Sequence, residues 1–283
     1  MSAAAPFVPT VVGSSFGEAL RYWRGRRGMS QLALSADSGI SQRHISFLES
    51  GRAQPSREMV LKMGLVLDIP LRQRNLMLLA AGFAPLYRER SLADPELRSV
   101  TRALELMMAK QEPYPAVVVD RLWDLAMANG AASGLLDWLL GPPESRAPAV
   151  QGTRNLVFAM LHPQGLRPYI VNWPQVAADL LQWIHREAMV EGPQGAAHSM
   201  LDELARLDGV PADWRMPNLE ARGTPFLPLK LSKQGVELNL FTTITTLGTP
   251  HDVTLHELRI ECFYPSDDAT ARWFEDASRE RTP

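Results

Sequence analysis

Apolar positions recur at helical spacing over the first ninety residues. Phe16, Leu20 and Trp23 are spaced i, i+4, i+7, the period of a helix with one buried face. Beyond them, serines suited to helix N-caps alternate with glycines and prolines suited to helix ends. The pattern predicts a bundle of five short helices, at about 15–27, 31–36, 42–49, 56–67 and 71–80.

The second and third predicted helices are joined by Asp37-Ser38-Gly39, a turn in which Gly39 is free to adopt a positive φ. Two short helices joined in this way are typical of a helix-turn-helix, whose second helix fits the major groove of DNA. Gln42 and Arg43 open that helix, and these residue types can pair with adenine and guanine. The alternative is a small bundle whose polar residues form an ordinary solvated face.

Further polar residues surround the predicted recognition helix. Ser41 caps it, and Ser46 lies on a polar face of it. Gln31 opens the preceding helix, where free N–H groups and the helix dipole attract a phosphate. Arg52 and Arg57 flank the recognition helix and could hold the DNA backbone without selecting a sequence. The predicted DNA-binding residues are Gln31, Ser41, Gln42, Arg43, Ser46, Arg52 and Arg57.

After a predicted linker, the hydrophobic period alternates between helical and strand-like. A helix at 95–110 precedes the β-type run 115–120, and alternation from Trp123 to Met127 predicts a hairpin around Asp120-Arg121. A helical section broken by prolines extends from 129 to about 207. Three strand-like runs follow at 226–232, 236–247 and 253–264, and then a helix at 268–278. This order predicts an α+β domain with a five-stranded antiparallel sheet, helices on one face and an apolar pocket.

Composition and charge narrow the class of protein. Of 283 residues, 46% are hydrophobic and 21% charged, which is typical of a core-forming protein. The single cysteine and the lack of a long apolar run or signal-like N-terminus favour a cytoplasmic protein that does not enter a membrane. Residues 1–90 carry 12 Lys and Arg against 6 Asp and Glu, whereas the remainder carries 17 against 25. The first third is therefore the part expected to meet a polyanion.

The stretch GMSQLALSADSGISQRHISFLESGRAQPSREMV at 28–60 resembles the Cro/phage-repressor class of helix-turn-helix, the XRE family. The resemblance implies that Gln31 braces the recognition helix and contacts phosphate. It also implies that Gln42, Arg43 and Ser46 contact bases.

A second resemblance covers roughly residues 95–279. The blocks PAVVVDRLWDLAMAN (115–129), RNLVFAMLHPQGLRPYIVNWPQVA (154–177) and FTTITTLGTPHDVTLHELRIECFYPSDDAT (241–270) resemble the ligand-binding domain of MmyB-like transcription regulators. The resemblance implies a PAS-like domain, a bacterial one-component regulator and a pocket for a fatty acid of myristate type. The predicted organisation is a tail at 1–12, a helix-turn-helix domain at 13–84, a linker at 85–94 and a PAS-like ligand-binding domain at 95–283.

An acyl chain needs an apolar wall, and its polar head needs a cation or several hydrogen-bond donors. Candidate wall residues are Trp123, Leu125, Leu156, Met160, Phe226, Leu240 and Ile244. Candidate head-group residues are Arg154, Asn155, His162 and Asn172, the first two lying at a predicted helix N-terminus. The alternatives are core packing for the wall residues, a helix cap at Asn172 and a helix stop at His162.

No spacing of His, Cys, Ser or Gly matches a metal, nucleophile or phosphate-binding motif. We therefore expect no enzyme, no metal and no cofactor apart from a bound fatty acid. One hypothesis is a homodimeric regulator that binds double-stranded DNA at a palindromic operator and senses a small apolar ligand. The other is a DNA-bound scaffold whose second domain only dimerises or binds a partner protein.

Overall fold

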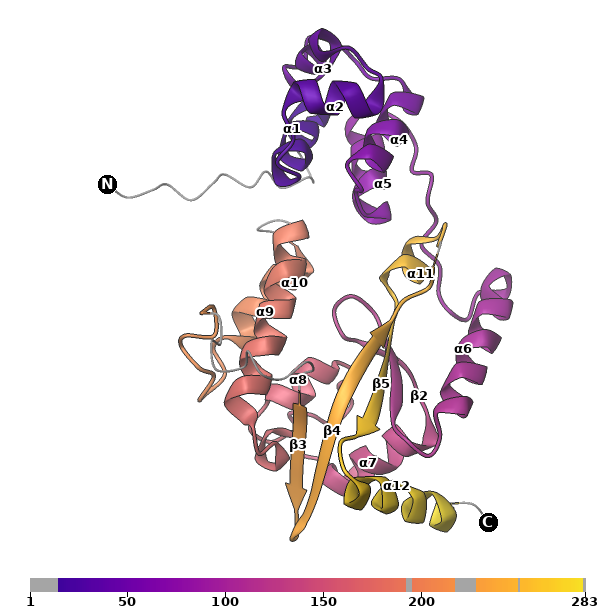
Figure 1. Cartoon of the computed structure of the whole chain (residues 1–283), viewed down its shortest axis with the longest axis vertical. Helices are drawn as coiled ribbons and strands as arrows, with labels where there is room; N and C mark the ends of the chain where they lie inside the picture. Colours follow the sequence, from indigo (N-terminus) through magenta and orange to yellow (C-terminus); the bar gives the residue numbers. More distant parts are fainter. Residues whose placement is uncertain (1–14, 192–194, 217–227, 249, 282–283) are drawn as a thin grey trace. The chain divides into compact units, whose positions relative to one another are not determined.

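The computed structural model describes residues 15–191, 195–216, 228–248 and 250–281 (Figure 1). The predicted tail at 1–12 and the wall candidate Phe226 lie outside these residues. The chain divides into two compact units. The first contains the residues up to Arg90 together with parts of 188–198 and 249–256, and the second contains the rest.

The first unit begins with the predicted five-helix bundle. The helices are α1 (Phe16–Arg26), α2 (Gln31–Ser38), α3 (Gln42–Glu49), α4 (Arg57–Val66) and α5 (Leu71–Ala80). Ser15, Ser30, Ser41 and Ser56 cap the first four, each accepting a hydrogen bond from the backbone N–H three residues on. Gly39 adopts φ 66° between α2 and α3. Local cap and turn chemistry therefore sets the boundaries that the sequence predicts.

The backbones of α1 and α3 approach each other closely at Gly17. A Cβ atom on this residue would overlap the carbonyl oxygen of Leu48 and lie 2.9 Å from that of Glu49. Leu20 and Trp23 of α1 are buried in the same core as Ile45 of α3. A glycine is needed at this point because no side chain fits between the two helices.

The segment after α5 is tied to the bundle. Asn75 accepts hydrogen bonds from the backbone N–H groups of Leu86 and Tyr87 at 3.0 Å and donates one to the Tyr87 carbonyl at 2.6 Å. Arg72 forms an ion pair of 2.6 Å with Glu89. The linker predicted at 85–94 thus begins as an ordered extension of α5.

A short helix, α11 (Val253–Glu257), occupies part of the predicted strand 253–264, so this part of the prediction is wrong. Buried Asp252 caps the helix by accepting hydrogen bonds from the N–H groups of Thr254 and Leu255, and it forms an ion pair of 3.1 Å with Arg90. The Thr254 hydroxyl donates to the Arg90 carbonyl and accepts from the Arg90 N–H. Cap chemistry overrides the strand-like apolar run here.

The second unit is built on a five-stranded antiparallel sheet of order β2-β1-β5-β4-β3 (Figure 1). The strands are β1 (Ala116–Val119), β2 (Leu125–Ala128), β3 (Pro228–Lys233), β4 (Val236–Thr245) and β5 (Arg259–Pro265). This confirms the predicted α+β fold class. It differs from the predicted hairpin at Trp123, which lies in the β1–β2 turn with φ 67° and not in the strand.

Helices cover the sheet on both faces, and not on one face as predicted. All four residues of β1 are buried although their side chains alternate between the faces, and both α6 and α7 contact β1. The helical elements are η1 (Pro95–Leu97), α6 (Arg98–Gln111), α7 (Gly130–Leu140), η2 (Pro143–Ser145), α8 (Leu156–Leu161), η3 (Arg167–Tyr169), α9 (Trp173–Glu191), α10 (Ala196–Leu204) and α12 (Asp268–Arg281). The arrangement is consistent with the predicted PAS-like domain.

Candidate DNA-binding surface and ligand pocket

The N-terminal turn of α3 is exposed. Gln42 and Arg43 lie at the surface, and Ser46 is half-buried one turn further on. Ser41 accepts a hydrogen bond of 3.3 Å from the His44 N–H, so its hydroxyl is used in capping the helix. The Arg43 guanidinium lies 5.4 Å from the centre of the Phe47 ring, which holds it along the helix by a cation–π contact.

Behind this turn, the carboxylate of Glu49 anchors the far end of α3. Its side chain is only 1% exposed and accepts from Arg24 at 2.5 and 3.0 Å. Gln31 donates to the same carboxylate at 2.9 Å, and Arg21 lies 3.7 Å away. Burial alone would raise the pKa of Glu49, but the hydrogen bonds and the two arginine charges outweigh it and lower that pKa. Gln31 therefore connects the start of α2 to the end of α3.

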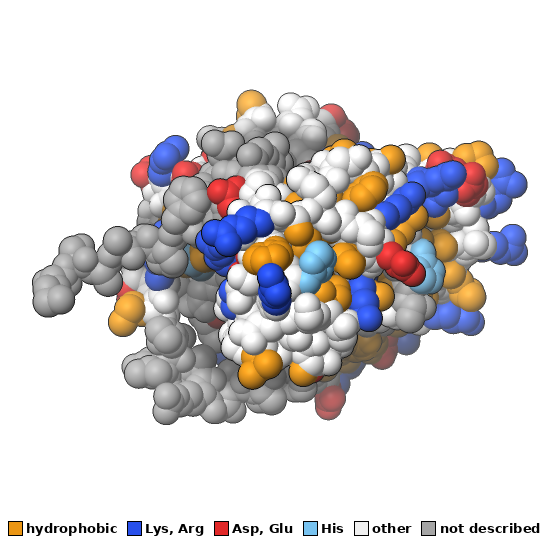
Figure 2. All heavy atoms as spheres, turned by 90° about the horizontal axis from the view of Figure 1, so that it is seen from above, with side chains coloured by type: hydrophobic (Ala, Val, Ile, Leu, Met, Phe, Trp, Pro, Cys, Tyr) orange, Lys and Arg blue, Asp and Glu red, His pale blue; other side chains and the backbone are white. Residues whose placement is uncertain are grey.

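Arg52, in the connection between α3 and α4, and Arg57, the first residue of α4, are both exposed. Figure 2 shows the basic side chains on this view of the molecule spread among uncharged polar and apolar atoms, not gathered in one block. Exposed arginines beside a recognition helix suit contacts with the phosphates of a nucleic-acid backbone. The roles given to Gln31, Ser41, Gln42, Arg43, Ser46, Arg52 and Arg57 stay predictions.

The second unit contains a pocket with purely apolar walls, between the sheet and helices α7 and α8. Its cavity volume is about 50 Å³, so a ligand longer than a few carbons would have to push the walls apart. Two predicted wall residues, Leu156 and Met160, line it. The other lining residues are Pro115, Val117, Ala132, Leu135, Leu136, Leu139, Leu166, Ile170, Leu229, Leu231 and Phe263.

The remaining described wall candidates lie elsewhere. Trp123 is buried and packs edge-on against Trp183 at 5.3 Å. Leu125 is half-buried on β2, at the edge of the sheet. Leu240 is fully buried on β4, and Ile244 is 45% exposed. Within the described residues none of these four lines the pocket.

The four predicted head-group residues serve the backbone. Arg154 donates to the Leu125 carbonyl at 2.7 and 3.1 Å. Asn155 caps α8, and His162 accepts from the Gln164 N–H at 3.1 Å. Asn172 connects to β3 through the Pro228 carbonyl and the Lys230 N–H. The contact of His162 fits the helix-end alternative, whereas the Asn172 side chain bonds to β3 and not to the start of α9. Among the described lining residues no cation faces the pocket.

Glu261 is a buried carboxyl on β5 that the sequence interpretation missed. It is 6% exposed, and burial raises its pKa to about 7 despite a hydrogen bond with Thr242. A charged residue in the middle of the run Leu258–Tyr264 is the available sequence signal. Because a buried carboxyl is costly unless it is well partnered, such a residue is a candidate for a functional site.

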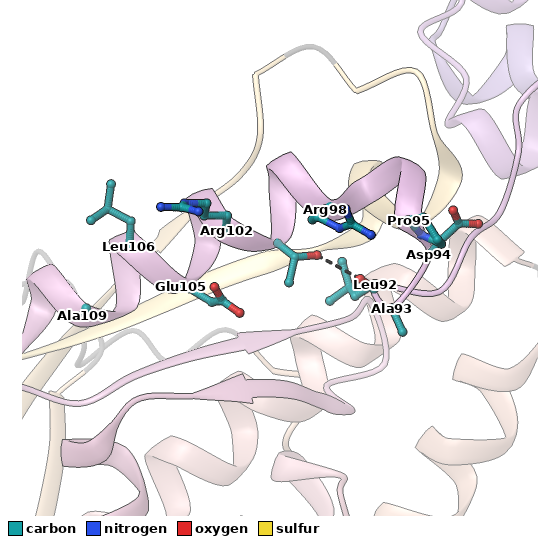
Figure 3. A pocket seen from close by; sticks show the side chains of 10 residues that line it. Leu92, Ala93, Asp94, Pro95, Arg98, Arg102, Glu105, Leu106 and Ala109 are labelled. Carbon is teal, nitrogen blue, oxygen red and sulfur yellow. Dashed lines mark hydrogen bonds between the residues drawn. The ribbon is translucent and has the colours of Figure 1, made fainter.

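A wider, open groove of about 640 Å³ follows the outer side of α6. Figure 3 shows Arg98, Arg102 and Glu105 projecting from this helix, with Leu106 further along it. Because charged side chains line it and solvent reaches it, the groove is less suited to an apolar ligand than the enclosed pocket. The described residues hold no cluster of His, Cys, Asp or Glu that could bind a metal, and none of their helices is long and apolar enough to cross a membrane.

Comparisons with known proteins agree with this geometry. Residues 20–73 match a helix-turn-helix family, and residues 100–277 match the family described as MmyB-like transcription regulator ligand binding domain. No curated protein matches the chain. A solved structure entitled "Structure of an RNA-binding Light-Oxygen-Voltage Receptor" is 14% identical over 96% of the chain, with a TM-score of 0.28. The chain spans 64% of that structure's length, and a TM-score this low carries no argument.

The fold and the two matches define a DNA-binding transcription regulator that carries a ligand-binding domain. Neither matched family is a family of enzymes. Because the second match covers more than half of its residues, the chain belongs to the MmyB-like transcription regulators.

Proposed function

We propose that the protein is a cytoplasmic, bacterial one-component regulator whose affinity for operator DNA changes when an apolar, acyl-chain-like ligand fills the pocket of the second unit. The observation that carries the proposal is the pocket, which has apolar walls throughout its described lining. Burying a methylene group stabilises a complex by about 0.8 kcal/mol. The affinity of a ligand for such a pocket therefore depends more on the length of its hydrocarbon chain than on its polar groups.

The DNA half of the proposal rests on the exposed start of α3. Gln42 and Arg43 would read base edges, while Arg52 and Arg57 would contact phosphates. Helix-turn-helix modules generally bind as dimers to two half-sites one helical turn apart. We therefore propose a homodimer on a palindromic operator.

The connection between β4 and β5 is the proposed route from ligand to DNA affinity. β5 carries the pocket residue Phe263, and the connection carries Asp252 and Thr254, which hold Arg90 of the linker. A ligand that moves the strands would move these contacts. Regulation follows only if the ligand binds the DNA-competent and incompetent states with different affinity.

The ligand half is tested with straight-chain alcohols and carboxylates of four to fourteen carbons. We expect the affinity, measured by isothermal titration calorimetry, to rise about fourfold per methylene and to level off when the pocket is full. Ala132→Phe, which fills the pocket, should abolish binding. Ala109→Phe, at an exposed alanine of α6, is the matched control and should leave binding unchanged.

The regulatory half is tested with an operator selected from random DNA by the purified protein. Affinity for this operator is compared with and without the ligand that binds most tightly. A ligand-induced change in wild type and in Ala109→Phe, but not in Ala132→Phe, supports the proposal. If the affinity for the operator is the same with and without bound ligand, the scaffold hypothesis is favoured.

A further inference from the structure

Glu261 lies on the same face of the sheet as the apolar pocket. In the antiparallel ladder, Glu261 pairs with Val117 of β1 on one side and with Ile244 of β4 on the other. Residues paired in this way have side chains on the same face, as do residues two apart along one strand. Val117 and Phe263 both line the pocket. The carboxyl of Glu261 therefore belongs to the sheet face that closes the pocket, at its β1–β5 end.

Thr242 completes a polar pair at this end. It is directly opposite Phe263 in the β4–β5 ladder, and its hydroxyl is hydrogen-bonded to Glu261. A carboxylate offers about four lone-pair sites, and one hydroxyl occupies only one of them. The pair thus retains acceptor capacity beside walls that otherwise consist of hydrocarbon.

Three of the predicted head-group residues do not offer an equivalent site. Arg154, Asn155 and Asn172 are engaged with backbone groups, and no cation is among the described pocket-lining residues. An ionised carboxylate at this end would face a second carboxyl, and the described lining of the pocket supplies no cation to offset the repulsion. A ligand group that donates hydrogen bonds would instead meet the acceptor oxygens of Glu261 and Thr242.

We propose that Glu261 and Thr242 bind the polar end of the ligand, and that this end is a hydrogen-bond donor such as a primary amine or alcohol. The proposal rests on the proposed function of the pocket and specifies the chemical class of its ligand. An amine gains a charged partner in Glu261, and an alcohol gains an acceptor. A carboxylate binds only if it shares a proton with Glu261.

Three probes of equal length, octylamine, 1-octanol and octanoate, separate these cases at pH 8. Glu261→Gln removes the charge but keeps hydrogen-bonding atoms. We expect this variant to bind octylamine at least tenfold more weakly than wild type, to bind 1-octanol within threefold of wild type and to bind octanoate more tightly. Glu261→Leu removes the acceptor as well, and we expect it to weaken 1-octanol at least tenfold. Dissociation constants from calorimetry are the readout, with far-ultraviolet circular dichroism as the check on folding.

Controls come from the opposite face of the same strands. Thr242→Val should weaken 1-octanol, whereas Thr243→Val, at the next position of β4, should not. Cys262→Ser is the matching control for Glu261 on β5. If either Glu261 variant does not fold, the contrast between Thr242→Val and Thr243→Val with 1-octanol still decides the proposal.

Failure of this proposal differs from failure of the pocket itself. If Ala132→Phe blocks all three probes while the Glu261 and Thr242 variants change none, the pocket binds ligands but its polar end is elsewhere, which overturns the inference. If octanoate binds wild type more tightly than octylamine and 1-octanol do, the inference is also wrong. If no probe binds wild type, the proposed ligand function and this inference both fail.

Discussion

The two units handle a buried carboxylate in opposite ways. Glu49 of the first unit is enclosed by Arg24, Arg21 and Gln31, which lower its pKa and hold it charged. Glu261 of the second unit has a threonine hydroxyl as its partner, and its pKa rises to about 7. A buried carboxylate with several hydrogen-bond and ion-pair partners holds the fold in place. A buried carboxylate with few partners can still bind a ligand, but it lowers the stability of the fold. The comparison separates a structural anchor from a candidate ligand contact.

Removing the charge of Glu49 tests the anchor and has the largest expected effect. Glu49→Gln leaves Arg24 without its buried partner, and breaking such a pair costs about 3–5 kcal/mol. Native-state hydrogen exchange of the α1–α5 amides measures the loss in the first unit. Asp68→Asn, at an ion pair whose carboxylate is 86% exposed, is the control and should cost under about 1 kcal/mol.

Removing the charge of Glu261 is expected to stabilise the protein, whereas removing the charge of Glu49 destabilises it. Its pKa is about 7 in the folded chain, against an ordinary value of 4.5 for a glutamate side chain, so the folded state retains the proton more strongly than the unfolded state. Stability from this group is fully present below pH 4.5 and falls as the pH rises to about 7. Glu261→Gln should therefore stabilise the second unit at pH 8 by about 3 kcal/mol.

Urea unfolding at pH 5 and pH 8, followed by hydrogen exchange in the strands, measures this change. The exposed Glu237 of β4 provides the control Glu237→Gln, which should leave the pH dependence as it is in wild type. A pH dependence that Glu261→Gln does not flatten would contradict the assignment of a buried carboxyl with few partners.

The close approach at Gly17 tests how rigidly α3 is placed. Gly17→Ala puts a methyl group against the Leu48 carbonyl, and overpacking of this kind costs about 1–3 kcal/mol. Gly25→Ala in the same helix meets no atom within 4 Å and should stabilise α1 by about 0.5–1 kcal/mol. Thermal unfolding that responds equally to the two substitutions would contradict the packing argument.

The smallest effect concerns DNA selectivity. Arg43→Ala should cost about 1–3 kcal/mol on the preferred operator and relax the preference at one base position. Arg52→Ala should weaken binding to all DNA sequences alike, and it should lower the salt dependence of the affinity by the amount expected for about one phosphate contact. Titrations of selected and scrambled operators at several salt concentrations distinguish the two. Arg43→Ala with unchanged selectivity would remove this residue from the base-reading set.

The first unit could be predicted from the sequence because its determinants are local. Serine caps, the turn at Gly39 and the spacing of apolar residues place each helix within about two residues of its observed bounds. The family resemblance supplied the bracing role of Gln31, and the hydrogen bond to Glu49 gives this residue a matching place. The role of Glu49 itself could not be predicted in this way, because it depends on Arg24, which is 25 residues away in the sequence.

The pocket was harder to predict because it depends on register between distant strands. Leu156 and Met160 were found, since an apolar helix between breaks must be buried. The chemistry of Arg154, Asn155, His162 and Asn172 suits a head group, but backbone carbonyls and N–H groups already occupy their hydrogen-bonding atoms. The sequence marks Glu261 as a charge within a mostly apolar run, but only the β1–β5 pairing places it beside Val117.

The contact between Arg90 and the β4–β5 connection bears on how such regulators exchange parts. A chimera joined at residue 84 keeps Arg90 with Asp252 and Thr254, whereas a chimera joined at 94 replaces Arg90 and leaves a buried carboxylate without that ion pair. A joint at 84 in turn separates Asn75 and Arg72 of α5 from Leu86, Tyr87 and Glu89, so the start of the linker has partners on both sides of the joint. Recombination, in evolution or in the laboratory, has to keep Arg90 together with the connection that carries Asp252 and Thr254.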